Sequence, residues 1–170
     1  MKSVLISIQP KWCELIASGK KMVEVRKTKP KLETPFKVYI YRTKGFVCHL
    51  CGGVWWNMPV GGTVIGEFVC NKIDEFIAIP NPPISVVQLW QDACLTKTEF
   101  YNYFDNSFNG YGWHISDLVI YDEPKELREF YHACTQPSGT DCAICLDRAV
   151  QKCWQITRPP QSWCYVEEGR

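Results

Sequence analysis

The stretch GKKMVEVRK, residues 19–27, alternates apolar and charged residues as a strand does when one of its faces is buried. Successive side chains of a strand point to opposite faces, so Glu24 and Arg26 should lie together, opposite the two valines. Lys21 stands at the start of this strand, where its side chain can curl toward the same side. The stretch therefore predicts two cations and one carboxylate gathered at one place.

Two physical interpretations of this charged trio are open. Lys21 and Arg26 would suit a phosphate or carboxylate group, with Glu24 accepting a hydrogen bond from a base edge or orienting Lys21. Alternatively, Glu24 and Arg26 form only a surface ion pair, worth about 0–1 kcal/mol. The residue types alone do not favour one interpretation over the other.

Short strands and a few helices are expected around this stretch. Strands are predicted over residues 4–8, 22–28, 36–44, 62–79 and 110–124. Helices are predicted over residues 11–18, 86–93 and 98–104. Residues 45–61 are expected to form an irregular insertion, and residues 156–168 an extended closing segment. Strand–helix alternation occurs only once, which argues against a doubly wound parallel sheet. We therefore expect an α+β fold in the form of a small mixed β-barrel.

Local signals place the helix boundaries. Pro10 suits the first turn of the first helix, and Gly19 is the residue expected to end it. Thr96 and Glu99 have the spacing of a capping box at the start of the third helix.

The composition is that of an ordinary soluble globular protein, with 46% hydrophobic and 22% charged residues in a chain of 170. A chain of this length fits one domain. No apolar run approaches the roughly 20 residues that span a bilayer. The apolar stretch 4–8 is too short for a signal peptide, because Gln9, Pro10 and Lys11 end it. We therefore expect a cytoplasmic protein that does not enter the membrane.

The net charge of +1 hides an asymmetry along the chain. Residues 1–50 hold 11 Lys/Arg and 3 Asp/Glu, a balance of +8, whereas residues 51–170 hold 8 and 15, a balance of −7. Such a division favours a surface for an anionic partner, with nucleic acid or a nucleotide first.

In the stretch GKKMVEVR the chain resembles the ASCH domain family, which has a PUA-like β-barrel fold. Residues 19–26, GKKMVEVR, match the family signature G-x-K-x-x-E-x-R. Other segments are similar to the same family, namely VLISIQPKW, VIGEF, GYGWHISDLVIYDEPKEL and ITRPPQSWCYVEE. They extend over nearly the whole chain, so the resemblance implies a single ASCH domain over residues 1–170.

The resemblance implies a cleft that holds Lys21, Glu24 and Arg26 and binds single-stranded RNA or a modified nucleotide. One branch of the family, bacterial amidohydrolases acting on N4-acetylcytidine, uses the signature lysine with a threonine in place of Glu24 and a glutamate from a later loop. Lys21 carries over to that pattern, but the threonine does not, and the second glutamate has no obvious counterpart here. An enzyme acting on RNA or acylated nucleosides, an amidohydrolase or a ribonuclease with Lys21 and Glu24 as catalytic residues, is therefore the alternative function. No organic cofactor is expected.

The segment GWHIS supplies further candidates for binding. In a strand, Trp113 faces away from His114, and His114 shares its side with Ser116. A tryptophan at the mouth of a barrel could stack on a base, and His114 could donate to a base edge or phosphate or act as an acid or base. The competing interpretation is that Trp113 is a core residue and His114 a structural one.

Ten cysteines are many for a cytosolic chain, where they more often bind metal or lie buried than form disulfides. The segment 132–155 holds a symmetric set around a Cys-x-x-Cys pair, which we call the C-terminal cysteine set: Cys134, Cys142, Cys145 and Cys153. Four thiolates would make a structural zinc site and order a segment without regular pattern, and the resulting knuckle could also dock a protein partner. Alternatively, Cys48 and Cys51 pair with Cys142 and Cys145 in such a site, or no metal is bound.

The remaining cysteines lie in apolar or strand contexts. We expect core positions for Cys13, Cys70, Cys94 and Cys164.

Overall fold

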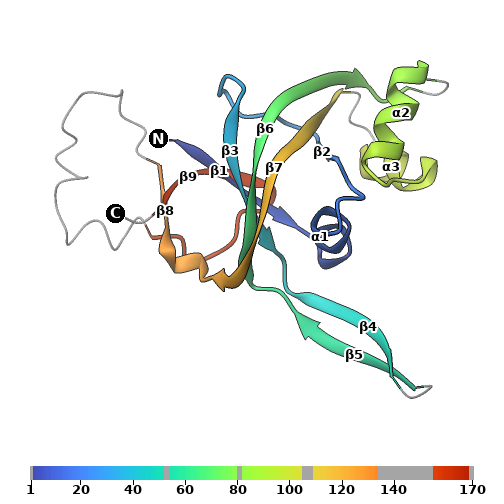
Figure 1. Cartoon of the computed structure of the whole chain (residues 1–170). Coiled ribbons are helices and arrows are strands. Elements are labelled where there is room, and N and C mark those ends of the chain that lie inside the picture. Colours follow the sequence, from blue (N-terminus) through green and yellow to red (C-terminus); the bar gives the residue numbers. More distant parts are fainter. Residues whose placement is uncertain (1, 52–53, 80–81, 105–108, 134–154, 169–170) are drawn as a thin grey trace, which may run out of the picture. The chain divides into compact units, whose positions relative to one another are not determined.

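The structure is a computed structural model that describes residues 2–51, 54–79, 82–104, 109–133 and 155–168 (Figure 1). The strands are β1 (Ser3–Ile8), β2 (Val23–Arg26), β3 (Phe36–Arg42), β4 (Gly45–Cys51), β5 (Val54–Val60), β6 (Thr63–Ile77), β7 (Asn109–Lys125), β8 (Phe130–His132) and β9 (Trp163–Glu168). The helices are α1 (Pro10–Ala17), α2 (Ile84–Asp92) and α3 (Lys97–Phe104), with a short 3₁₀ helix, η1, at Leu127–Glu129.

Seven of these strands form one open sheet in the order β2-β7-β6-β3-β1-β9-β8. The sheet is mixed, because β1 runs parallel to β3 and antiparallel to β9. The expected α+β class is thereby confirmed. In the described ranges, β2 and β8 end the sheet, so the predicted closure into a barrel is not confirmed.

Contacts divide the chain into two compact units. The first comprises residues 1–10, 38–66 and 121–170, and the second residues 11–37 and 67–120. The first unit has a core at which β1, β3 and β9 meet η1 and β8. Its buried members are Leu5, Tyr39, Tyr41, Val64, Leu127, Phe130, Ile156 and Val166.

The segment 45–61 of the first unit differs from the irregular insertion that we expected. Strands β4 and β5 pair in regular antiparallel register, from Gly45 opposite Val60 to Cys51 opposite Val54, and form a two-stranded sheet of their own. Figure 1 shows this hairpin as two long neighbouring strands. The segment is thus ordered by backbone pairing.

The second unit has a core that packs β2 and the end of β6 against α2 and α3. Its buried members are Val23, Val25, Phe76, Val86, Leu89, Trp90, Ala93, Phe100 and Phe104. Gly110 of β7 lets this packing become close, since a Cβ built there would lie 2.3 Å from the Phe76 ring. The two valines therefore face the helices, as their alternation with charged residues predicts.

Local boundary signals of α1 and α3 are confirmed. Helix α1 begins at Pro10, and Gly19 follows its end with a left-handed φ of +71°. The Glu99 N–H donates to Thr96 Oγ1 at 3.2 Å, and the Thr96 N–H donates to Glu99 Oε2 at 3.0 Å, which is the reciprocal pair of a capping box. None of the helices in the described ranges has the length and hydropathy to cross a membrane.

Candidate nucleic-acid interface

The backbone around Lys21 is held by the ends of two helices. After Gly19, the N–H groups of Lys20 and Lys21 both donate to the carbonyl of Leu15 in α1, at 2.9 and 3.0 Å. The N–H of Met22 donates to the carbonyl of Asp92 at the end of α2, at 2.8 Å. The turn from α1 into β2 is therefore fixed, and the Lys21 side chain starts from a defined position.

Lys21, Glu24 and Arg26 meet in what we call the ionic cluster. Lys21 Nζ lies 3.3 Å from Glu24 Oε2, and Arg26 Nη2 lies 3.0 Å from Glu24 Oε1. Lys21 Nζ also donates to the carbonyl of Ala93 at 2.7 Å. The side chains are only 3%, 9% and 9% exposed. The three charged tips converge as strand geometry predicts, and their burial rules out the alternative of an exposed surface ion pair.

The ionic cluster carries an excess of one positive charge, because two cations share one carboxylate. Burying charges removes them from water, so such a cluster needs compensating contacts. Two aromatic side chains contribute to its surroundings: the Trp12 ring centroid lies 5.1 Å from Lys21 Nζ, and the Tyr103 hydroxyl accepts from Arg26. Burial raises the pKa of the Tyr103 phenol, although the charge of Arg26 acts in the opposite direction. The cluster is therefore a compact, cation-rich site bordered by aromatic rings.

Exposed lysines follow the ionic cluster along the chain. Residues 19–31 hold six Lys/Arg and one Glu, a balance of +5. Four of the lysines are exposed, namely Lys20, Lys27, Lys29 and Lys31. Sequence reasoning counted these four only in the overall charge asymmetry and did not select them as site residues. The asymmetry was the signal for them, because residues 19–31 supply +5 of the +8 balance of residues 1–50.

Trp113 is fully buried, on the face of the sheet opposite Val23 and Val25. It is opposite Glu24 in the ladder between β2 and β7, it is 0% exposed, and its ring meets that of Phe36 edge-on at 5.9 Å. The base-stacking role predicted for Trp113 therefore has no exposed ring face in this structure. Sequence alternation could not distinguish a stacking platform from a core position.

His114 and Ser116 are not brought to the ionic cluster. His114 is opposite Val23 in the ladder, and thus on the other face of the sheet from Glu24. Its Nε2 lies 2.7 Å from Asp74 Oδ2. Burial acts to raise the pKa of Asp74, but hydrogen bonds from Lys72 and His114 outweigh it and lower that pKa. Ser116 Oγ donates to the carbonyl of Val69 at 2.9 Å. Both residues make structural contacts between β7 and β6.

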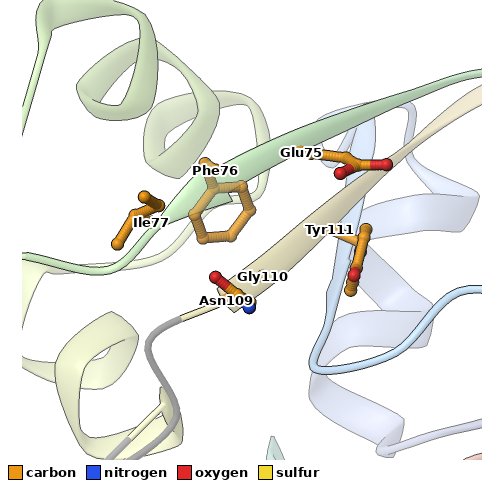
Figure 2. A pocket seen from close by; sticks show the side chains of 6 residues that line it. All are labelled: Glu75, Phe76, Ile77, Asn109, Gly110 and Tyr111. Carbon is orange, nitrogen blue, oxygen red and sulfur yellow. The ribbon is translucent and has the colours of Figure 1, made fainter.

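A small hollow lies where the end of β6 meets the start of β7. We call it the β6–β7 hollow; it has a volume of about 260 Å³, and Figure 2 shows its lining residues Glu75, Phe76, Ile77, Asn109, Gly110 and Tyr111. Tyr111 is the ladder partner of Arg26, so both side chains lie on one face of the sheet. The cleft predicted from the sequence held Lys21, Glu24 and Arg26 instead. The β6–β7 hollow was not predicted, because the pairing of β6 with β7 is not visible in the sequence.

The proposed metal ligands cannot be placed. The C-terminal cysteine set lies within residues 134–154, outside the described residues. Where the chain is described, no group of three or more His, Cys, Asp or Glu is arranged to hold a metal ion. Cys13 and Cys70 are buried as expected, and the partly buried Cys164 packs against the core of the first unit. Cys94 is only partly buried, which corrects its assignment to the core. The zinc site stays a prediction.

A family comparison gives the relationship of this chain. The model of the ASCH domain matches residues 6–133. The chain belongs to the ASCH domain family. This family is PUA-like and is associated with RNA binding. The ASCH match includes all three members of the ionic cluster and ends before the C-terminal cysteine set. No curated protein matches the sequence.

Solved structures support the same fold. The crystal structure of ASCH from Zymomonas mobilis has a TM-score of 0.60 and 21% sequence identity, covering 97% of this chain and 87% of that one. A serine-to-alanine mutant of the same bacterial ASCH protein also has a TM-score of 0.60, with 22% identity over 97% of this chain and 88% of that one. At this identity the likeness shows a shared ASCH fold.

Proposed function

We propose that this ASCH domain binds single-stranded RNA, or a modified nucleotide, through the basic surface around β2. The observation that carries the proposal is the ionic cluster, in which Lys21 and Arg26 share Glu24 and leave one positive charge in excess. A phosphate would balance this charge. The association of the family with RNA binding supports the same class of ligand.

The exposed and buried cations have different roles in this proposal. Exposed lysines beside β2 meet successive phosphates and give affinity without sequence preference. Lys21 and Arg26 are held in place and contact the one phosphate that reaches the ionic cluster. Glu24 fixes both cations and accepts from a base edge that comes within its reach.

The test is the salt dependence of binding to a short labelled single-stranded RNA, followed by fluorescence anisotropy. The logarithm of the binding constant should fall with the logarithm of salt concentration by about 0.7 for each phosphate contact. The double variant Lys27→Gln/Lys29→Gln should lower this slope by about 1.4. Lys44→Gln is the control, because Lys44 is also exposed but stands outside residues 19–31. Binding that does not change with salt, or that the double variant leaves unaltered, overturns the proposal.

Catalysis is the second candidate, and one observation favours it. Lys21 is a buried lysine with a carboxylate oxygen at 3.3 Å, an arrangement suited to proton transfer or to a nucleophilic amine. To attack, its nitrogen would have to leave the carbonyl of Ala93. Incubation with N4-acetylcytidine and with labelled RNA separates the two functions. Turnover that is lost in Lys21→Met supports an enzyme, whereas binding without turnover of either substrate leaves the binding function.

A further inference from the structure

We infer that the β6–β7 hollow holds one base of the bound RNA and prefers a base with an exocyclic amino group over uracil. This inference rests on the proposed function, since it names the subsite that takes the base next to the phosphate-binding cations. It adds Tyr111, Glu75 and Asn109 to the binding residues.

The hollow has the size of a single flat ring. Its volume of about 260 Å³ lies just below the roughly 300–1,000 Å³ of pockets that enclose drug-sized ligands. A base with part of its sugar fits such a space, whereas several stacked nucleotides do not. The hollow is therefore suited to one base that is turned out of a single strand.

Strand alternation places the side chains of Glu75, Ile77 and Tyr111 on the face of the sheet opposite Phe76. Phe76 belongs to the core with α2 and α3, and Gly110 lies against its ring. Glu75 and Ile77 are the neighbours of Phe76 on β6, and hence point to the other face. Tyr111 shares that face with Arg26, its ladder partner. Figure 2 shows Glu75 and Tyr111 together at one side of the hollow.

Each of these side chains offers a contact that a base can use. The Tyr111 ring provides a surface for stacking, and Ile77, which is 54% exposed, offers an apolar contact. Asn109 carries both a donor and an acceptor, while the Glu75 carboxylate is an acceptor only. An exposed apolar and aromatic surface with two polar groups has the composition of a base-binding site.

Lys29 shows that the ring and the carboxylate can act together on one ligand. Its ammonium pairs with Glu75 and also lies 5.5 Å from the centre of the Tyr111 ring. Because the Lys29 side chain is 43% exposed, a base can take its place over the ring. The displaced ammonium is then near the phosphate that follows the base, so Lys29 pairs with that phosphate at the edge of the hollow.

The chemistry of Glu75 gives the base preference. A carboxylate accepts the amino hydrogens of cytosine, while the same position of uracil is a carbonyl oxygen that also only accepts. Cytosine and uracil have nearly the same size and stacking surface. A difference in their affinity therefore measures contacts to the edge of the base and not its size or stacking, and Glu75→Gln assigns the part that Glu75 contributes.

The experiment compares binding of the RNA octamers rC8 and rU8 at pH 7.5 by fluorescence anisotropy, in the full chain. The wild type should bind rC8 at least about five-fold tighter than rU8. Tyr111→Ala should weaken rC8 binding by about 5- to 150-fold, whereas Tyr111→Phe should keep it, because the stacking ring remains. Tyr121→Ala is the matched control. Tyr121 lies on the same strand with Lys125 at 5.0 Å over its ring, but outside the hollow.

Glu75→Gln is the second variant, and unlike Tyr111→Ala it does not remove a partly buried ring. Its side chain is 60% exposed, so the fold should tolerate the change. Removal of a negative charge raises the affinity for both RNAs, and the readout is therefore their ratio, which should fall to about one. Thermal unfolding of every variant confirms that the fold is kept.

The outcomes separate this inference from the proposed function. Salt-dependent RNA binding that Tyr111→Ala leaves within two-fold of the wild type overturns the base site alone. Equal affinity of the wild type for rC8 and rU8 overturns the base preference. If the wild type binds neither RNA at any salt concentration, the proposed function and the base site both fall.

Discussion

Glu24 of β2 and Trp113 of β7 are directly opposite each other in their ladder, so a carboxylate and a fully buried indole share one face of the sheet. The carboxylate thus has an apolar neighbour on one side. On the other sides Lys21 and Arg26 replace the water that it has lost. The two cations depend in turn on Glu24, which makes it the central member of the ionic cluster.

Glu24→Gln should therefore destabilise the protein strongly. The amide leaves two buried cations close together without the charge that compensates them, which typically costs about 3–5 kcal/mol in the free energy of unfolding. Urea denaturation followed by circular dichroism measures the change. Lys11→Gln is the control, because the ion pair of Lys11 with Glu99 is exposed and should be worth less than about 1 kcal/mol. Equal effects of the two variants would contradict the buried cluster.

Gly110→Ala should also destabilise the protein, by about 1–3 kcal/mol, because the new methyl group would overlap the buried Phe76 ring. Gly19→Asn is the comparison. At Gly19 a Cβ meets nothing within 4 Å, and asparagine tolerates the left-handed φ of +71° better than other residues. Differential scanning calorimetry should show the larger fall in Tm for Gly110→Ala. The reverse order would mean that α2 and α3 do not pack as described.

The charge of Glu99 gives a prediction about pH. A hydrogen bond from Lys11, and then one from the backbone N–H of Thr96, lower the pKa of Glu99 from 4.5 to about 2. Because the folded pKa is depressed, the stabilising effect is complete above pH 4.5 and is lost as the pH falls toward 2. Its size should be at most about 1 kcal/mol, since the carboxylate is exposed. An NMR titration should show that Glu99 loses its charge below pH 4.5, and Thr96→Ala should move its pKa upward.

The C-terminal cysteine set predicts about one zinc ion per chain in the purified protein, measured by elemental analysis. The double variant Cys142→Ser/Cys145→Ser should remove the metal, whereas Cys94→Ser should retain it. A separate variant, Cys48→Ser/Cys51→Ser, tests the alternative site that joins both Cys-x-x-Cys pairs. Loss of zinc from this variant would favour that site. Metal-free wild-type protein prepared with added zinc would refute both arrangements.

The elements that the sequence predicts well are those with local signals. Pro10 and Gly19 bound α1, and Thr96 and Glu99 cap α3, through contacts made within four residues along the chain. Strand alternation also predicts that Glu24 and Arg26 share a face, since this depends only on the period of the strand. Family resemblance adds the ASCH fold, which the family match supports, whereas the expected closure into a barrel is not confirmed.

The features that the sequence did not predict depend on distant residues. Ala93, which accepts from Lys21, is 72 positions away, so the burial of the ionic cluster has no local signal. The β6–β7 hollow likewise exists only because two distant strands meet. The hairpin at 45–60 is a different case. Gly52 and Gly53 between two strand-like runs are a recognised turn signal, but the glycine and aromatic content suggested an irregular segment.

The place of β2 at the end of the sheet has a consequence for solubility. An edge strand can pair with another copy of itself and start aggregation, and short length and inward-pointing charges are two ways to prevent this. β2 has both, with four residues and the side chains of Glu24 and Arg26 turned into the protein. Any slip of its register would expose valines and bury unmatched charges. Replacing the three residues of the ionic cluster with leucines would remove the inward-pointing charges. The signature strand therefore also protects the chain against self-association.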